Sequence, residues 1–273
     1  MIQFPNAKIN LGLSVVKKRE DGFHDLETIF YPIALFDCLE FIVSNKTSFA
    51  LYSDEETLIN TEENTVWKAY DLLQKKHPTI PALNIQLLKK IPSGAGLGGG
   101  SADGSFMLMM LNKYFQLKIP KEKLLEYALS LGSDCPFFIY NTPCFATGQG
   151  EKLSPISLDL SAYTLIIVKP KIHISTAWAF SQLSAQKPSN SILEVIQKPI
   201  VSWRDILIND FQSPIENHYP QLKEIRQKLY SLDALYASMS GSGSSYYAFF
   251  DKKNFCKHDI SKVFSDCNVY FTQ

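Results

Sequence analysis

The stretch Ile91-Pro-Ser-Gly-Ala-Gly-Leu-Gly-Gly-Gly-Ser-Ala102 decides how the rest of this sequence is interpreted. Leu83, Ile85 and Leu87 alternate with Asn84 and Gln86, which predicts a strand that runs to about Ile91, and Pro92 ends it. Residues 102–115 are apolar nearly all round, which predicts a buried helix. A glycine-rich turn between a strand and a helix lets main-chain N–H groups converge on an anion at the positive end of the helix. The stretch therefore predicts a phosphate-binding loop.

The familiar nucleotide loops do not fit this stretch. Gly94 to Gly99 has the spacing G-x-G-x-x-G, which is weak evidence alone because a flexible turn has the same pattern. A Walker loop needs a lysine after its last glycine, and this loop ends Gly100-Ser-Ala102. A dinucleotide site expects an acidic residue about 20 positions later, after a second strand. Residues 118–122 instead lie between two predicted helices, and Ser101 could contact a phosphate or cap its helix.

Composition narrows the class of protein. The chain has 273 residues, of which 45% are hydrophobic and 20% are charged, so it can bury a core as one large domain or two small ones. Lys and Arg total 27 and so do Asp and Glu, which argues against a nucleic-acid binder. The only arginines are Arg19, Arg204 and Arg226, so an anionic ligand must be held mostly by lysine and main-chain N–H groups.

The five cysteines and the apolar segments indicate the compartment. The cysteines are widely spaced without C-x-x-C, which argues against a zinc ribbon or a disulfide framework and favours free thiols. We see no signal peptide at the N-terminus, and apolar runs such as 106–111 are far shorter than the ~20 residues of a spanning helix. We expect a soluble, cytoplasmic protein.

The order of predicted elements indicates an α+β protein with two domains, 1–158 and 159–273. The first domain begins with strands at 9–15, 29–35 and 39–43, and Asn64 is a good cap for a helix. A helix over 120–132 ends just before Ser133 and Asp134. In the second domain, we predict strands at 165–168, 235–239 and 246–250, helices at 176–184, 191–197, 203–209, 219–231 and 254–265, and a final strand.

Three segments together resemble a known superfamily. The glycine stretch is similar to the phosphate loop of the galactokinase, homoserine kinase, mevalonate kinase and phosphomevalonate kinase superfamily, and Pro5-Asn-Ala-Lys-Ile-Asn10 and Met239-Ser-Gly-Ser-Gly-Ser-Ser245 match its other two motifs in the right order. The resemblance covers nearly the whole chain. It implies a two-domain small-molecule kinase fold, with an N-terminal ribosomal-protein-like domain, a C-terminal ferredoxin-like α+β domain, and an active site in the cleft between them.

Four further segments resemble one branch of this superfamily. They are Ala7-Lys-Ile-Asn10, Asp21-Gly-Phe-His24, Gly132-Ser-Asp-Cys-Pro-Phe137 and Asn209-Asp-Phe211. This resemblance implies ATP-dependent phosphorylation of the 2-hydroxyl of a cytidine-diphosphate-linked methylerythritol, a step of the non-mevalonate route to isoprenoid precursors. It also implies a Mg²⁺ ion that the protein does not cage.

The same resemblance implies the roles of the site residues. Asp134 is implied as the base or orienting group of the acceptor hydroxyl, with Lys8 as its partner. Taken alone, Asp134 is as consistent with a turn or helix cap, and Lys8 with the solvated face of a strand. The nucleotide-binding residues implied are Pro92, Ser93, Gly94, Ala95, Gly96, Leu97, Gly98, Gly99, Gly100, Ser101 and Ala102. The substrate-binding residues implied are Asn10, Phe23, His24, Phe180, Ser240, Gly241, Ser242 and Gly243.

Several alternatives remain at this point. Trp178 competes with Phe180 as the second aromatic ring against the cytosine, and Ser240 to Ser245 is equally typical of a hairpin connection. The whole chain is also compatible with a homoserine or mevalonate type of kinase. A nicotinamide-dependent oxidoreductase and a nucleic-acid module fit the sequence less well, because the acidic partner and the basic excess that they require are missing.

Overall fold

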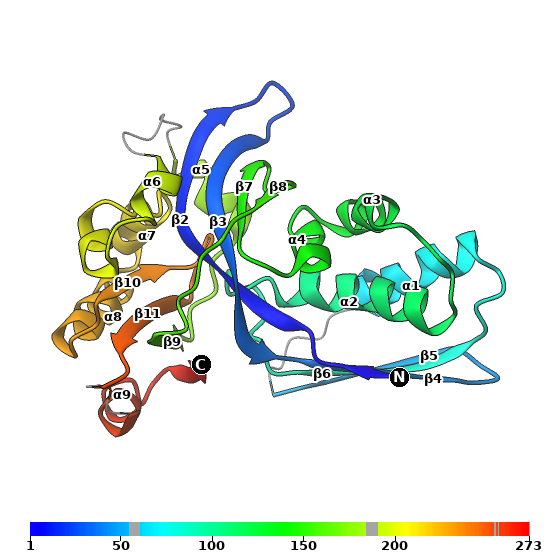
Figure 1. Cartoon of the computed structure of the whole chain (residues 1–273). Coiled ribbons are helices and arrows are strands. Elements are labelled where there is room, and N and C mark those ends of the chain that lie inside the picture. Colours follow the sequence, from blue (N-terminus) through cyan, green and yellow to red (C-terminus); the bar gives the residue numbers. More distant parts are fainter. Residues whose placement is uncertain (55–60, 184–190, 254, 256, 273) are drawn as a thin grey trace. The chain divides into compact units, whose positions relative to one another are not determined.

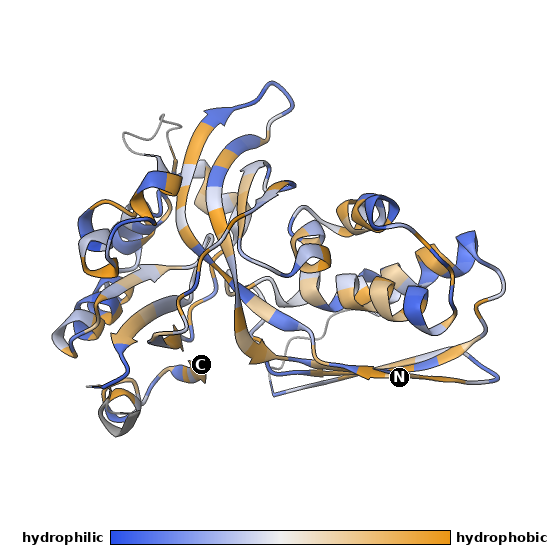
Figure 2. Cartoon of the chain, viewed as in Figure 1, coloured by the Kyte–Doolittle hydropathy of each residue, from blue (hydrophilic) through white to orange (hydrophobic). Residues whose placement is uncertain are grey.

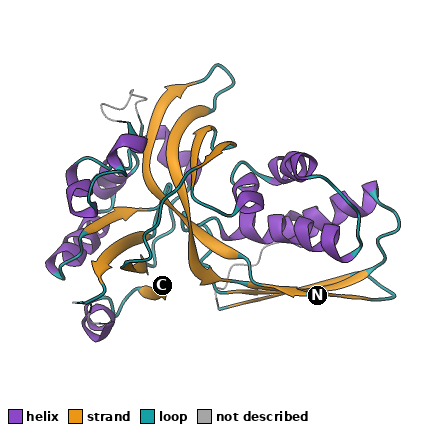
Figure 3. Ribbon diagram, in the orientation of Figure 1, coloured by secondary structure: helices purple, strands orange, loops and turns teal. Residues whose placement is uncertain are grey.

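The computed structural model describes residues 1–54, 61–183, 191–253, 255 and 257–272 (Figure 1). It divides into two compact units. Unit one consists of Met1–Ala7, Leu35–Ser93 and Gly98–Thr142, and unit two consists of Lys8–Ala34, Gly94–Leu97 and Pro143–Gln273. Both units combine helices and strands (Figure 3), so the predicted α+β class is confirmed.

Unit one is a helix-covered sheet with the strand order β1-β4-β6-β5. Its strands are β1 (Ile2–Gln3), β4 (Cys38–Val43), β5 (Ser48–Ser53) and β6 (Leu83–Lys89). Strand β6 pairs antiparallel with β4 and parallel with β5. Leu83, Ile85 and Leu87 of β6 are fully buried in the core that the helices cover, which confirms the alternation read from the sequence.

The α-helices of unit one lie on one side of this sheet (Figure 1). They are α1 (Thr65–Lys76), α2 (Gly99–Tyr114), α3 (Lys121–Leu131) and α4 (Cys135–Tyr140), with a short 3₁₀ turn η1 (Thr61–Glu63) before α1. Asn64 caps α1 as predicted, because its side-chain oxygen accepts the N–H of Val66 at 2.9 Å. Helix α2 is buried along most of its length and begins directly after Gly98.

The first sheet of unit two has the order β2-β3-β7-β8. Its strands are β2 (Asn6–Lys18), β3 (His24–Phe36), β7 (Cys144–Gly148) and β8 (Lys152–Pro155). Every residue of β2 from Asn6 to Val15 is buried, polar ones included. The expected solvated face of this strand is therefore wrong, and side chains such as Lys8 and Asn10 must find partners inside the protein.

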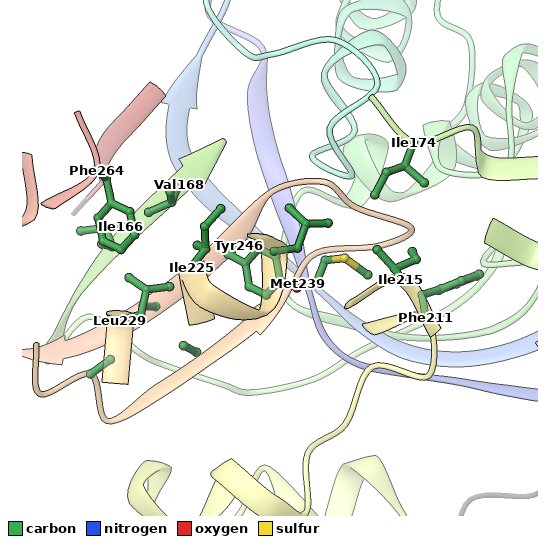
Figure 4. Close-up of a cluster of buried hydrophobic side chains, with 14 of the residues drawn as sticks. Ile166, Val168, Ile174, Phe211, Ile215, Ile225, Leu229, Met239, Tyr246 and Phe264 are labelled. Atoms are coloured by element: carbon green, nitrogen blue, oxygen red, sulfur yellow. The ribbon is translucent and has the colours of Figure 1, made fainter. Parts of the chain in front are cut away.

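The second sheet of unit two has the order β10-β11-β9-β12. Its strands are β9 (Tyr163–Lys169), β10 (Tyr236–Met239), β11 (Tyr246–Asp251) and β12 (Asn268–Thr272). The helical segments of the unit are α5 (Thr176–Ser181), α6 (Ile192–Val195), η2 (Ile200–Asp205), α7 (Gln212–His218), α8 (Pro220–Ser231) and α9 (Lys257–Val263). Ile215, Ile225 and Leu229 of α7 and α8 join Val168 and Tyr246 of the sheet in one apolar core (Figure 4).

The helices mix apolar and polar residues, as expected for helices with one face on a sheet (Figure 2). No helix among the described residues combines the length and the apolar character that crossing a bilayer requires.

One predicted helix is wrong. Residues 203–209 were expected to be helical, but only the turn η2 forms, ending at Asp205. The chain then runs alongside β2, where Leu13 donates its N–H to the carbonyl of Ile208 at 2.9 Å and accepts the N–H of Asp210 at 2.8 Å. Main-chain pairing with a neighbouring strand has replaced helical pairing, a tertiary effect that local sequence does not encode.

Candidate active site

Three glycines of the loop adopt left-handed backbone conformations. Gly94, Gly96 and Gly98 have φ angles of 59°, 77° and 70°. Alternation of left-handed glycines with ordinary residues turns successive N–H groups toward one side and makes a concavity for anions. Gly98 is also the residue from which α2 starts, so Ser101 does not cap the helix. The loop conformation is therefore compatible with the phosphate site that the sequence predicts.

The glycine loop packs tightly against the loop that joins β10 to β11. The Ser240 hydroxyl donates to the carbonyl of Gly96 at 2.8 Å, and the N–H of Ser245 donates to the carbonyl of Ala95 at 3.3 Å. A side chain at Gly96 would put its Cβ 2.0 Å from the carbonyl oxygen of Ser240. Residues 240–245 therefore form a hairpin connection, which was one of the two interpretations of the sequence. They also hydrogen-bond to the glycine loop.

The start of β2 lies against the same two loops within unit two. Lys8 donates its main-chain N–H to the carbonyl of Leu97 at 2.9 Å, and Asn10 donates its N–H to the Ser240 hydroxyl at 3.2 Å. The Lys8 ammonium donates to the side-chain oxygen of Asn10 at 2.6 Å, while the amide nitrogen of Asn10 donates to the hydroxyl of Thr28 at 3.1 Å. Residues from all three motifs are therefore neighbours in one compact unit.

The segment Asn209-Asp210 holds the second loop in place. The side-chain amide of Asn209 donates to the carbonyls of Met239 and Gly241, both at 2.8 Å. The Asp210 carboxylate accepts the N–H of Val15 at 2.7 Å. Asn209 and Asp210 thereby connect the loop between β10 and β11, called the Ser/Gly loop below, to strand β2.

Asp134 immediately precedes α4 in unit one. It occupies the capping position of that helix, yet its carboxylate makes no capping hydrogen bond, so the helix-cap interpretation is wrong. The adjacent Cys135 is fully buried, and burial raises the pKa of its thiol to about 11. Cys135 is therefore a neutral, packed side chain and not a nucleophile, as expected from the sequence.

Two of the predicted substrate-binding rings are stacked on one another in unit two. His24 at the start of β3 lies parallel to Phe180 of α5, with ring centroids 5.0 Å apart and an interplanar angle of 21°. Trp178 instead contacts the rings of His218 and Tyr219. The structure thus brings Phe180, and not Trp178, to the histidine.

Phe23 lies at the end of the hairpin turn that precedes β3. Its N–H donates to the carboxylate of Asp21 at 3.1 Å, which orders the turn, while its ring is 57% exposed. A large aromatic side chain left in solvent beside the stacked His24 is available to bind a flat ligand.

One residue near the loop escaped the sequence analysis. His173 follows β9, and its ring fills the space that a side chain at Gly94 would take, with the ring carbon Cε1 3.2 Å from that Cβ position. The hydroxyls of Thr176 and Ser242 are 3.2 Å apart, so the chain after His173 also contacts the Ser/Gly loop. Nothing in the spacing of a lone histidine, distant in sequence from the glycines, indicates this contact.

Comparisons with known proteins agree on a kinase. The chain matches the family models "GHMP kinases N terminal domain" over residues 64–142 and "GHMP kinases C terminal" over residues 196–265. The 4-diphosphocytidyl-2-C-methyl-D-erythritol kinase of Bacteroides fragilis is 48% identical over 97% of each chain, and that of Bacteroides thetaiotaomicron is 50% identical over 92% of each. A crystal structure of a 4-(cytidine 5'-diphospho)-2C-methyl-D-erythritol kinase, 27% identical, superposes over 100% of this chain and 98% of its own with a TM-score of 0.86.

Proposed function

The chain belongs to the 4-diphosphocytidyl-2-C-methyl-D-erythritol kinase family, and from this we propose that it transfers the γ-phosphoryl group of ATP to the 2-hydroxyl of 4-diphosphocytidyl-2-C-methyl-D-erythritol. The observation that carries the proposal is the identity of 48–50% over more than nine tenths of the chain. The reaction is a step of the non-mevalonate route to isoprenoid precursors, and it places this protein among the ATP-dependent kinases.

The nucleotide phosphates are assigned to residues 92–102. The left-handed glycines support this assignment, because main-chain N–H groups and the start of α2 supply positive potential without a cluster of arginines. Residues 240–243 contact the glycine loop through the hydrogen bond from the Ser240 hydroxyl to the carbonyl of Gly96. We assign them to the phosphates of the acceptor substrate. The Asn10 side chain, held by Lys8 and Thr28, is assigned to the same substrate.

A magnesium ion is expected with the ATP. Among the residues that the structure describes, no three His, Cys, Asp or Glu side chains form a group that could hold a metal. We propose that the ion is carried mainly by the phosphate oxygens of the nucleotide. When bound, it would neutralise charge on the phosphates.

Asp134 is assigned as the group that accepts the proton of the acceptor hydroxyl. The hydroxyl oxygen forms a bond to the γ-phosphorus, the bond from that phosphorus to the β,γ-bridging oxygen breaks, and ADP leaves. The position of Asp134 in Gly132-Ser-Asp-Cys-Pro-Phe137, the segment that resembles the family's motif, supports the assignment. Lys8 is assigned as the cation that orients the hydroxyl, and its burial beside Asn10 holds its ammonium group in a fixed position.

The cytosine is assigned to Phe23, His24 and Phe180. The imidazole and nearby main chain can hydrogen-bond the edge of the base, and an aromatic ring can cover its face. The exposed ring of Phe23 and the contact between His24 and Phe180 support this assignment.

Removing the exposed ring should weaken substrate binding selectively. We expect Phe23→Ala to raise KM for the cytidylyl substrate roughly tenfold, because stacking on a base is worth ~1–3 kcal/mol, while KM for ATP stays within about twofold. Steady-state kinetics with each substrate varied in turn measure both values. Phe4→Ala, which removes a ring of equal exposure from unit one, should change neither constant. Equal increases in both constants would reject the cytosine assignment.

The proposed reaction is tested by a substrate panel. ADP formation, followed by a coupled assay, should require 4-diphosphocytidyl-2-C-methyl-D-erythritol and should stay at background with homoserine or mevalonate. Turnover of homoserine or mevalonate at a comparable rate would reject the proposed substrate while leaving the kinase family intact. A test with NAD and the same alcohols should show no reduction of the nicotinamide.

Two finer points complete the proposal. Domain boundaries at 1–158 and 159–273 stay a prediction: each family match falls within one of these ranges, but the compact units divide the chain differently, with 8–34, 94–97 and 143–158 in unit two. The cytoplasm is supported as the compartment by the four described cysteines, all of them free thiols, since reducing compartments keep thiols in this form. The cysteines are Cys38, Cys135, Cys144 and Cys267.

A further inference from the structure

Unit one contains a buried cluster of three charged side chains, none of which is assigned to catalysis. The Lys89 ammonium donates to a carboxylate oxygen of Asp37 at 2.5 Å and to Oδ2 of Asp103 at 2.7 Å. The side chains of Asp37 and Asp103 are 0% and 2% exposed, and that of Lys89 is 8% exposed. The second oxygen of Asp103, Oδ1, is buried with no hydrogen-bond partner among the described residues.

The cluster connects the two ends of the glycine stretch. Asp37 also accepts the main-chain N–H groups of Lys90 at 2.5 Å and Ile91 at 2.8 Å, directly before the loop. Asp103 lies in α2, directly after the loop. Lys89 bridges the two carboxylates, so the entry and exit of the loop are held by the same ammonium group.

The cluster carries an excess negative charge beside the phosphate-binding helix. Two carboxylates and one ammonium sum to −1 when all are ionised. The Lys89 ammonium also lies close to the first residue of α2, since a Cβ on Gly99 would be 3.1 Å from Nζ. An uncompensated charge of this kind is costly in the interior, and protonation of one carboxylate removes it.

Asp103 is the carboxyl group that takes the proton most easily. Burial raises its pKa to about 7, opposed by the ammonium of Lys89 and reinforced by the carboxylate of Asp37. For Lys89, burial lowers the pKa, but the two carboxylates outweigh this effect and hold the group charged.

Among the described residues, the buried side chains of the helices packed against α2 add no other ionised group to this cluster, and the carboxylate of Asp134 lies at the start of α4. The buried side chains of α3 are apolar, and α4 contributes the neutral thiol of Cys135. Those of α1 are apolar except Tyr70, whose hydroxyl donates to the carbonyl of Pro81 at 3.2 Å. Asp37, Lys89 and Asp103 are therefore the buried charges that the described residues place at this part of α2.

We propose that Asp37, Lys89 and Asp103 position the phosphate loop and couple nucleotide binding to protonation of Asp103. This inference rests on the proposed nucleotide site. A nucleotide brings several negative charges to the loop, and Coulomb repulsion from the excess charge of the cluster disfavours the fully ionised state. Nucleotide binding therefore favours the protonated form of Asp103, and the loop holds its ligand more tightly below neutral pH than above it.

The first test is calorimetric binding of Mg-ADP to the full-length protein. From pH 6 to pH 8, Kd should rise by about three- to tenfold more in the wild type than in Asp103→Asn, which keeps the shape but cannot ionise. Comparing the two proteins cancels the ionisation of ADP itself. Binding to the wild type at pH 7 should also take up more protons than binding to Asp103→Asn, measured in buffers of different ionisation enthalpy.

Asp37→Asn is the second variant, in case Asp103→Asn does not fold. It leaves Asp103 and Lys89 as a balanced pair, so Asp103 stays ionised to lower pH and the same pH dependence should disappear. Asp71→Asn, which breaks an exposed ion pair with Lys75, should retain the wild-type profile. Identical pH profiles in the wild type and both cluster variants would overturn the inference, whereas failure of the wild type to bind Mg-ADP at any pH would instead reject the proposed nucleotide site.

Stability gives a readout that does not depend on nucleotide. Because the pKa of Asp103 is higher in the folded than in the unfolded chain, the folded state binds more protons between about pH 4 and pH 7. Stability of the wild type relative to Asp103→Asn should therefore fall as pH rises through this window and level off above it. Thermal unfolding at pH 5, 6, 7 and 8 measures the difference, and a constant difference at all four values would contradict the raised pKa.

Discussion

Asp134→Ala is expected to lower kcat by roughly 10²–10⁴ with little change in either KM, which is the scale of a lost acid–base group. The carboxylate is assigned to receive the hydroxyl proton during transfer, so its loss should raise the barrier without weakening ground-state binding. Burst and steady-state kinetics on the purified variant measure this.

Asp134→Asn separates two roles of the carboxylate. An amide can still accept a hydrogen bond and orient the hydroxyl, but it cannot take up the proton. If Asp134 is a true base, the Asn and Ala variants should be equally slow, whereas an orienting role predicts a much faster Asn variant. Asp71→Asn is the control and should keep the wild-type kcat. A wild-type kcat in Asp134→Ala would contradict the assignment of Asp134.

Gly96→Ala should have a large structural effect for a single added methyl group. Its φ of 77° is unfavourable for a residue with a side chain, and the new Cβ would lie 2.0 Å from the Ser240 carbonyl oxygen. The two loops must then separate. We expect a loss of roughly 3 kcal/mol, a fall in Tm of about 6–12 °C, and a loss of activity of at least about 100-fold.

Gly22→Ala is the matched control for this prediction. Gly22 has a φ of 85°, but nothing lies within 4 Å of the position where its Cβ would be. The change should cost only the backbone strain, about 1 kcal/mol, and a fall in Tm of roughly 2–4 °C. Similar effects of the two substitutions would show that the contact between the loops contributes little.

The elements that sequence predicts best are those whose pattern is local. The alternation of β6, the cap of Asn64 on α1 and the position of α2 after the glycines all follow from periodicity or from side-chain chemistry a few residues apart. The predicted helix over 203–209 failed because those residues pair with β2, almost 200 positions earlier. The hairpin of β7 and β8 was also missed, although its two strands are close in sequence; only the pairing of β7 with β3 is long-range.

In the candidate site, too, some features follow from the local sequence and others depend on contacts between distant residues. The loop conformation follows from its glycines, and the neighbourhood of the three motifs follows from their resemblance to a family. The contact of His173 with Gly94 and the charges around Lys89 depend on long-range packing, and neither has a spacing that would reveal it. A buried lysine such as Lys8 cannot be distinguished from a surface lysine until its neighbours are known.

The most direct test of the proposed reaction is phosphorus-31 NMR of the complete reaction with ATP and 4-diphosphocytidyl-2-C-methyl-D-erythritol. We predict one new phosphomonoester signal in equal amount to the ADP formed. The signal should lack three-bond coupling to hydrogen, because carbon 2 carries a methyl group and no hydrogen. A signal split by such coupling would place the phosphate on another hydroxyl, and inorganic phosphate as the only product with ADP would contradict phosphoryl transfer to the substrate altogether.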